Sequence, residues 1–159
     1  MTEPAESAES AEPERTLHYA DDISAADVDA LAAFIDDRLK ALATRHRGQL
    51  EEQRATLGLV NVTHHLMSSL RHHLEQRSAR PDEASTESFD RRLDIQRDWN
   101  LLCEAVSPWR DAEGYDSARW HHLQHLDAAA RARHEALAAG ADSETAAENA
   151  TGRGQGAPA

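Results

Sequence analysis

Apolar residues recur at helical spacing in four stretches of the chain, and polar or turn-forming segments separate these stretches. In the first stretch, one face carries the large apolar residues Val28, Leu31, Ile35, Leu39 and Leu42. Ser24 and Asp27 form a shortened capping box at its start, and Ile23 with Val28 occupies the positions of a hydrophobic staple. These signals predict a helix over 24–47.

The second stretch has an apolar face made of Leu59, Val62, Leu66, Met67, Leu70 and Leu74. An unbroken helix would rotate this face by roughly 120° from the first one, so a break is expected between them. We place the break at Gly48, because a glycine that follows basic residues is typical of a helix C-terminus. Gly58 is the alternative, because Leu50 and Leu57 remain in phase with the first face. The second helix is predicted over 50–78.

The third stretch, 88–107, gathers its main apolar residues in one arc, namely Ile95, Trp99, Leu102, Cys103 and Val106. Phe89 and Leu93 lie on the flank of this arc. Pro108 ends the helix, because its ring clashes with the preceding turn and it has no N–H to donate.

A fourth helix is predicted over 116–139, after a turn around Gly114. Asp116 or Ser117 would cap its start. Its apolar arc consists of Trp120, Leu123, Leu126, Ala130 and Leu137. Gly140 follows the last apolar turn, as expected at a helix C-terminus.

The pattern as a whole predicts an all-α protein with a four-helix bundle-like domain over 23–140. Alternation of apolar and polar residues, which is typical of strands, is absent. Segments 1–22 and 141–159 contain too few large apolar residues to offset the entropy of ordering them. We expect both to be disordered tails, the first one acidic.

The charge distribution argues against nucleic acid and anionic membrane surfaces as partners. Of the net charge of −12, six units lie in 1–22 and two in 141–159, so the predicted domain is only mildly acidic. Phosphate binding needs clustered positive charge, which is not apparent here. No apolar run approaches a membrane span, and the first residues do not resemble a secretory signal, so the cytoplasm is the expected compartment.

Sequence motifs of catalysis or cofactor binding are missing. There is no G-x-S-x-G elbow, no phosphate-binding loop and no H-E-x-x-H. Cys103 is the single cysteine, and its apolar neighbours indicate a buried, inert thiol. An enzyme is therefore not expected, and neither is a bound cofactor.

Histidine is unusually frequent, with ten in the chain. On a helix, His121 and His125 would lie one turn apart and could reach one transition-metal ion, with further ligands supplied by the second helix. Those distant candidates are His64, His65 and His72. The simpler interpretation is a set of solvated helix faces without a metal.

The turn from Trp109 to Tyr115 is the candidate interaction surface, because Trp and Tyr frequently anchor interfaces. The alternative is that these aromatic residues fold over the end of the bundle. The sequence thus predicts a non-enzymatic protein-interaction module, working alone or as a homo-oligomer. The alternative function is a metal-binding helical bundle that uses His121 and His125.

Overall fold

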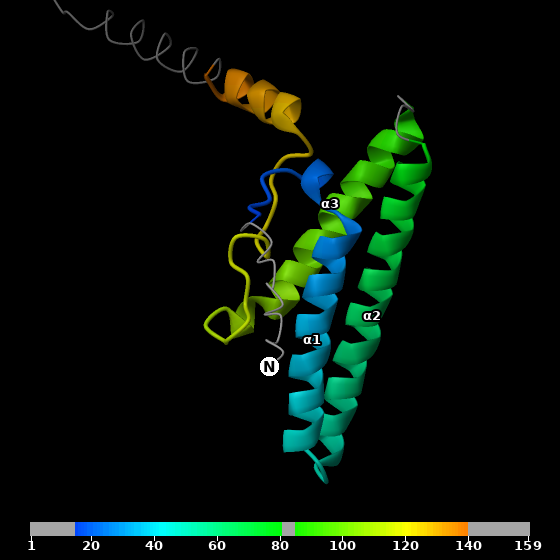
Figure 1. The fold of residues 1–159 in the computed structure, drawn as a ribbon, viewed down its shortest axis with the longest axis vertical. Coiled ribbons are helices and arrows are strands. Elements are labelled where there is room, and N and C mark those ends of the chain that lie inside the picture. The colour runs from blue at the N-terminus through cyan, green and yellow to red at the C-terminus, as the bar shows by residue number, and fades with distance from the viewer. Residues whose placement is uncertain (1–14, 81–84, 140–159) are drawn as a thin grey trace, which may run out of the picture.

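The computed structural model describes residues 15–80 and 85–139. Its three long helices are α1 (Ala25–Arg45), α2 (Leu50–Ala79) and α3 (Thr86–Val106). Two short 3₁₀ helices, η1 (Ala20–Asp22) and η2 (Ser107–Trp109), flank them, and a further helix covers 128–139. These two described ranges contain no strand, so the predicted all-α, bundle-like fold is confirmed (Figure 1).

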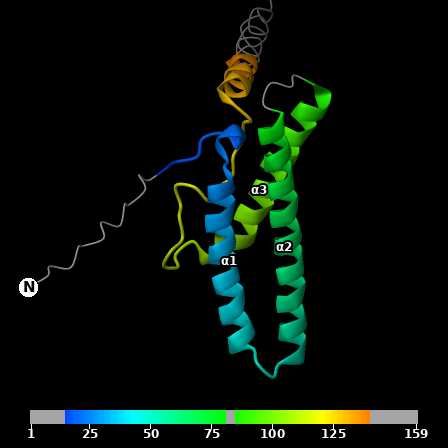
Figure 2. The ribbon, with the colours of Figure 1, turned by 45° about the vertical axis from the view of Figure 1, so that its right-hand side comes forward.

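The break between the first two helices lies at Gly48, as predicted. Gly48 has φ 91°, a left-handed conformation that glycine adopts without steric cost. Gly58, the alternative position, lies inside α2. The tight turn makes α1 and α2 an antiparallel pair (Figures 1 and 2).

The predicted start of α1 is also confirmed. The Ser24 hydroxyl accepts the backbone N–H of Asp27, and the Asp27 carboxylate accepts the backbone N–H of Ser24 at 2.8 Å. Ile23 and Val28, the two staple residues, are both fully buried. Interactions between residues close together in the sequence, the capping box and the hydrophobic staple, therefore determine where α1 begins.

The core lies where α3 crosses the α1–α2 pair. Trp99 is completely buried, and its indole Nε1–H donates to the carbonyl of His121 at 3.3 Å. α2 packs against both α1 and α3. Below this crossing, the α1–α2 pair continues without α3 beside it (Figures 1 and 2).

The prediction of a fourth helix over 116–139 is wrong for its first half. Residues 110–127 form turns and extended chain, and only 128–139 are helical. The side chain of Asn100 on α3 binds both backbone groups of Leu123, donating to its carbonyl at 3.0 Å and accepting from its N–H at 2.9 Å. Gln96 donates to the same carbonyl at 2.9 Å. These side-chain amides replace the hydrogen bonds that a helix would have supplied.

The apolar spacing in this region nevertheless identified the correct core residues. Trp120, Leu123 and Leu126 are buried, although they reach the core from non-helical chain. Leu137, from the same predicted arc, is 75% exposed on the helix 128–139. That helix extends away from the bundle (Figure 1).

The N-terminal boundary of the domain differs from the prediction. Residues 15–22, expected to be part of a disordered tail, are docked on the core, where Leu17 and Ala20 are buried. Their backbone pairs with the segment 118–126 through three hydrogen bonds, including Ala20 N–H to the carbonyl of His125 at 3.1 Å. The rest of the predicted tails, 1–14 and 141–159, lies outside the described residues.

The apolar face predicted for α2 is only partly correct. Met67, Leu70 and Leu74 are buried, but Leu66 is half-buried and Val62 is 58% exposed. Val62 precedes the part of α2 that α3 covers. None of the helices within the described residues is long and apolar enough to cross a membrane.

Candidate functional site

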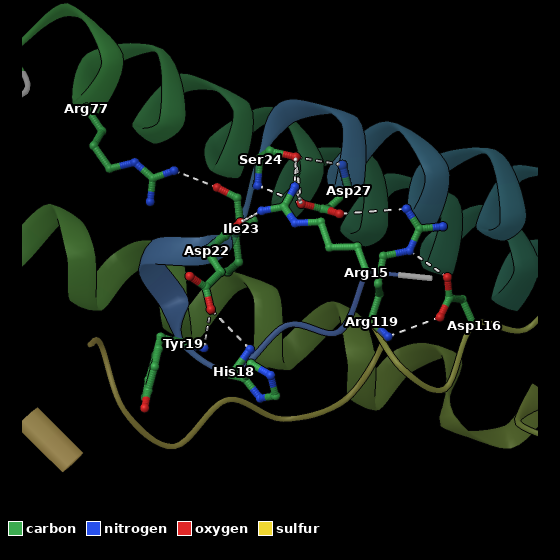
Figure 3. Close-up of polar contacts among 10 residues, drawn as sticks. All are labelled: Arg15, His18, Tyr19, Asp22, Ile23, Ser24, Asp27, Arg77, Asp116 and Arg119. Atoms are coloured by element: carbon green, nitrogen blue, oxygen red, sulfur yellow. Dashed lines mark hydrogen bonds and ion pairs between the residues drawn. The ribbon is translucent and has the colours of Figure 1, made fainter. Parts of the chain in front are cut away.

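A buried carboxylate at the start of α1 connects three segments of the chain (Figure 3). Asp27 is 1% exposed and accepts hydrogen bonds from the backbone N–H and, at 2.6 Å, the hydroxyl of Ser24. Arg15 Nη1 lies 3.3 Å from its Oδ2, and Arg119 Nη1 lies 3.7 Å from its Oδ1. Two cations and a helix cap compensate for burying this charge.

Arg119 is held in place by its own neighbour. Its Nε donates to the Asp116 carboxylate at 2.5 Å, and Asp116 also accepts the backbone N–H groups of Ala118 and Arg119 at 3.1 Å (Figure 3). Asp116 was expected to cap a long helix, and it caps this turn instead. Since both Asp27 oxygens have partners from other segments, Asp27 links the N-terminal segment, the start of α1 and the segment around Arg119.

A cleft of about 720 Å³ lies next to this cluster, between the N-terminal segment, the start of α1 and the end of α2. Arg77 on α2 donates from Nη2 to the carbonyl of Ile23 at 2.5 Å, while its Nη1 is buried without a partner (Figure 3). Burial lowers the pKa of the Arg77 guanidinium, an effect opposed by Asp21 and Asp22. Since protein atoms enclose Nη1, a ligand in the cleft cannot reach it. Arg77 therefore links α2 to the residues just before α1.

Cys103 is buried, as its neighbours in the sequence predicted. Burial raises the pKa of its thiol to about 12, so the thiol remains protonated at neutral pH. It borders a smaller cleft of about 370 Å³ that is also lined by Tyr115, Trp120 and His121. A protonated thiol is a poor nucleophile, so Cys103 is not activated for covalent catalysis.

The predicted pairing of His121 with His125 depended on a helix that does not form. Residues 121–125 are not helical, and the His125 ring lies beside that of His134 instead, at a centroid distance of 5.4 Å. Among the described residues, no three His, Cys, Asp or Glu side chains are placed to hold a metal ion.

The candidate histidines on α2 are also separated from this region. His64 Nε2 lies 3.0 Å from an Asp36 carboxylate oxygen, and His72 is hydrogen-bonded to Gln76. His65 is exposed. The predicted supply of further metal ligands from α2 thus has no geometric support in the described part of the chain.

The Trp109–Tyr115 turn packs beside the middle of α1, at Phe34, and not over the end of the α1–α2 pair. The Tyr115 hydroxyl donates to the carbonyl of Trp120 at 2.8 Å, and its ring packs edge-on against Trp120 and Phe34. Burial raises the pKa of the Tyr115 hydroxyl. Trp109 is half-buried against the core.

A different surface, not anticipated from the sequence, is exposed to solvent. We call residues 40–62, the end of α1 and the start of α2, the arm. None of these residues is fully buried. Three large apolar side chains in the arm are mainly exposed, namely Leu50 at 60%, Leu57 at 59% and Val62 at 58%. The arm is the part of the α1–α2 pair that extends beyond α3 (Figures 1 and 2).

One face of α2 runs from the core into the arm. Glu51, Ala55, Gly58 and Val62 recur at helical spacing, are all exposed, and are called the arm stripe below. Seven residues beyond Val62, on the same face, Ser69 donates to Asp98 of α3 at 2.7 Å. The part of the face that α3 contacts is therefore followed by a part that no described residue covers.

Gly58 is the least expected member of this stripe. A Cβ atom added there would meet nothing within 4 Å, so no neighbour in the described chain requires a glycine. Glycine inside an exposed helix costs about 1 kcal/mol relative to alanine. The polar run before Gly58 and this glycine were the sequence signals that could have revealed the arm.

The arm also differs in charge from the rest of the protein. It contains four basic residues, Lys40, Arg45, Arg47 and Arg54, and two acidic ones, Glu51 and Glu52. Its net charge is thus +2 in a chain whose net charge is −12.

No family model, curated protein or solved structure matches this chain. Inference about its function therefore rests on the chemistry of these surfaces.

Proposed function

We propose that the protein is a non-enzymatic interaction module that binds a helix of another polypeptide along the arm stripe of α2. The observation that carries this proposal is the absence of any fully buried residue between Leu39 and Thr63. Short helices depend on tertiary packing for most of their stability. A two-helix extension with exposed Leu57 and Val62 gains such packing when a partner covers it.

The geometry of α2 suits a helical partner. A helix on the arm stripe would take, in the lower half of the molecule, the position that α3 occupies in the upper half. Packed helices approach to about 8–10 Å, and small residues at the contact allow the closest approach. Ala55 and Gly58 provide such a surface, with Val62 as an adjacent apolar contact. A partner helix would also account for a glycine that nothing else in the described chain explains.

The net charge of the arm indicates which kind of helix would bind it. The arm has a net charge of +2, from four basic residues and the acidic Glu51 and Glu52. Complementary charges at the rim of an interface mainly improve specificity and association rate. The expected partner helix is amphipathic, with an apolar stripe bordered by Asp or Glu.

Photo-crosslinking in cells tests this proposal. A photoreactive residue at Val62 should form crosslinks to protein, whereas the same residue at Ala33, an exposed position on α1 outside the arm, should not. Gly58→Arg should abolish the Val62 crosslinks, because a long side chain blocks the approach of a helix. Equal crosslinking at Val62 and Ala33 would show that the arm is ordinary solvated surface.

A further inference from the structure

We infer that His125 and His134 form a reversible binding site for a divalent transition-metal ion such as Zn²⁺, and that the bound ion links the helix 128–139 to the chain before it. The two rings lie side by side although they come from different segments. His125 belongs to the non-helical chain that packs on the core, and His134 belongs to the helix. This site is separate from the arm and does not depend on the function proposed for it.

The two imidazole rings have the separation of two ligands on one ion. Their centroids are 5.4 Å apart, and their planes are inclined by 49°. A zinc–nitrogen bond of about 2.0–2.1 Å places each ring centre about 3 Å from the ion, so two rings at a tetrahedral angle have centres about 5 Å apart. Rotation of the two side chains therefore suffices to bring one nitrogen of each ring onto a shared ion, without movement of the backbone.

The ring nitrogens of this pair are available to an ion. Within 15–80 and 85–139, no group forms a hydrogen bond or ion pair with either ring. His134 is exposed and His125 is half-buried, so an ion from solvent can reach both. Four other histidines already have a partner for a ring nitrogen, namely His46 with Gln49, His64 with Asp36, His72 with Gln76 and His122 with Glu104.

A second pair of neighbouring rings, His72 and His73, lacks this availability. Their centroids are 6.0 Å apart, but His72 Nε2 lies 2.7 Å from the side-chain amide of Gln76. The Nδ1 atom of His73 is buried in the protein. This pair therefore supplies a matched control for the site at His125 and His134.

The backbone around both rings is held in place before an ion binds. The carbonyl of His125 accepts the N–H of Ala20 at 3.1 Å. Asp127 caps the helix through the N–H of Ala130 at 2.6 Å and pairs with Arg92 of α3. Ligands that are already positioned lose little conformational entropy on binding. None of residues 131–139 is buried, so an ion at His134 would give this part of the helix a contact to the core.

The chemistry of the pair indicates the class of ion and the strength of binding. Neutral imidazole is a good ligand for Zn²⁺, Cu²⁺ and Ni²⁺. Closed structural zinc sites have four protein ligands, whereas no group of three suitable side chains occurs among the described residues. Water would complete the coordination of an ion at this pair. Occupancy should therefore follow the concentration of free metal, as in a reversible site.

Isothermal titration calorimetry of the full chain, without a His tag and with ZnCl₂ as the titrant, tests the site. The pH is chosen so that free imidazole is neutral. We expect the wild type to bind one Zn²⁺ at this site, and His125→Gln and His134→Gln each to weaken the affinity at least tenfold. His72→Gln should retain the wild-type affinity. Equal affinity in the wild type and His134→Gln would overturn the inference.

Hydrogen exchange of residues 128–139 tests the link that the ion would make. The shared ion binds only while the two rings are together, so it should suppress opening of the helix. At a free Zn²⁺ concentration about a hundred times Kd, exchange should slow by up to about a hundredfold. The wild type and His72→Gln should show this protection, and His134→Gln should not. Unchanged exchange in the wild type saturated with Zn²⁺ would overturn the link, even if both histidines bind the ion.

Discussion

Ser69 on α2 donates a hydrogen bond of 2.7 Å to the carboxylate of Asp98 on α3, and this carboxylate is only 2% exposed. Asp98 is a charged residue beside the apolar arc around Trp99, and it is buried at the contact between the two helices. Asp98→Ala leaves the Ser69 hydroxyl without its acceptor, and we expect the free energy of unfolding to fall by about 1–3 kcal/mol. Chemical denaturation measures this change.

The control for that experiment is Asp94→Ala on the same helix. Asp94 is half-buried and pairs with the exposed Arg97 at 2.9 Å, an arrangement that contributes at most about 1 kcal/mol. Asp98→Asn should lose less stability than Asp98→Ala, because its amide oxygen still accepts from Ser69. An equal loss in the Asp94 and Asp98 alanine variants would contradict the role given to Asp98.

Substitutions along apolar positions should distinguish the core from the arm. Leu102 is fully buried, so Leu102→Ala should cost about 2–5 kcal/mol. Val62→Ala in a monomeric sample should change stability by no more than about 0.5 kcal/mol. Thermal unfolding of dilute samples measures both. A large loss for Val62→Ala in the monomer would mean that the arm is covered by its own chain.

Acid should loosen the helix 128–139 before it unfolds the core. The Asp127 carboxylate accepts the N–H of Ala130 at 2.6 Å and pairs with Arg92, so it caps this helix and ties it to α3. These contacts, the Ala130 hydrogen bond first, lower the pKa of Asp127 below its ordinary value. Because the pKa of Asp127 is lower in the folded chain than in the unfolded one, the ionised carboxylate stabilises the folded helix at pH values above the unfolded-state pKa. This stabilisation is lost as the pH falls through the pKa of the folded state.

Hydrogen exchange of residues 128–139 measures this effect. Protection should fall on acidification in the wild type and should be low at every pH in Asp127→Ala. Asp127→Asn retains a capping side chain but cannot titrate, so its protection should not respond to pH in this range. A pH response that persists in Asp127→Asn would assign the effect to another group.

Docking of the N-terminal segment can be tested at Leu17. Leu17 is fully buried and its N–H donates to the carbonyl of Ala118 at 3.3 Å. Leu17→Asp places a charge in this apolar site, so residues 15–22 should detach and become sensitive to proteases. His18→Asp, at an exposed neighbouring position, should leave the wild-type resistance unchanged. Rapid cleavage within 17–22 of the wild type would show that the segment is not docked.

Local signals in the sequence predicted the three long helices well. The Ser24–Asp27 capping box, Gly48 and Pro108 each act within a few residues, and the structure places helix boundaries next to all three. The helical spacing of apolar residues around Trp99 likewise predicted which side chains of α3 are buried. Such features depend on backbone chemistry that neighbouring residues determine.

Long-range contacts explain what could not be predicted. The spacing of Trp120, Leu123 and Leu126 suits a helix, but hydrogen bonds from Asn100 and Gln96 hold the segment extended. The spacing of apolar residues correctly identified which side chains are buried. It did not reveal that this segment of the backbone is non-helical. The arm was missed for a related reason, because the apolar periodicity of α2 does not reveal where α3 stops covering it.

The pairing of residues 17–21 with 118–126 has a consequence for how the chain folds. The hydrogen bond from Ala20 to His125 joins residues more than a hundred positions apart, whereas α1 and α2 meet across a short turn. Contacts distant in sequence carry a larger loop-closure entropy and tend to form late. We expect the α1–α2 hairpin and α3 to assemble first and this pairing to complete the native state. During unfolding, separation of residues 17–21 from 118–126 would expose Trp120 and Leu123 while α1, α2 and α3 remain packed together. Partial opening of the native protein should therefore begin at this pairing.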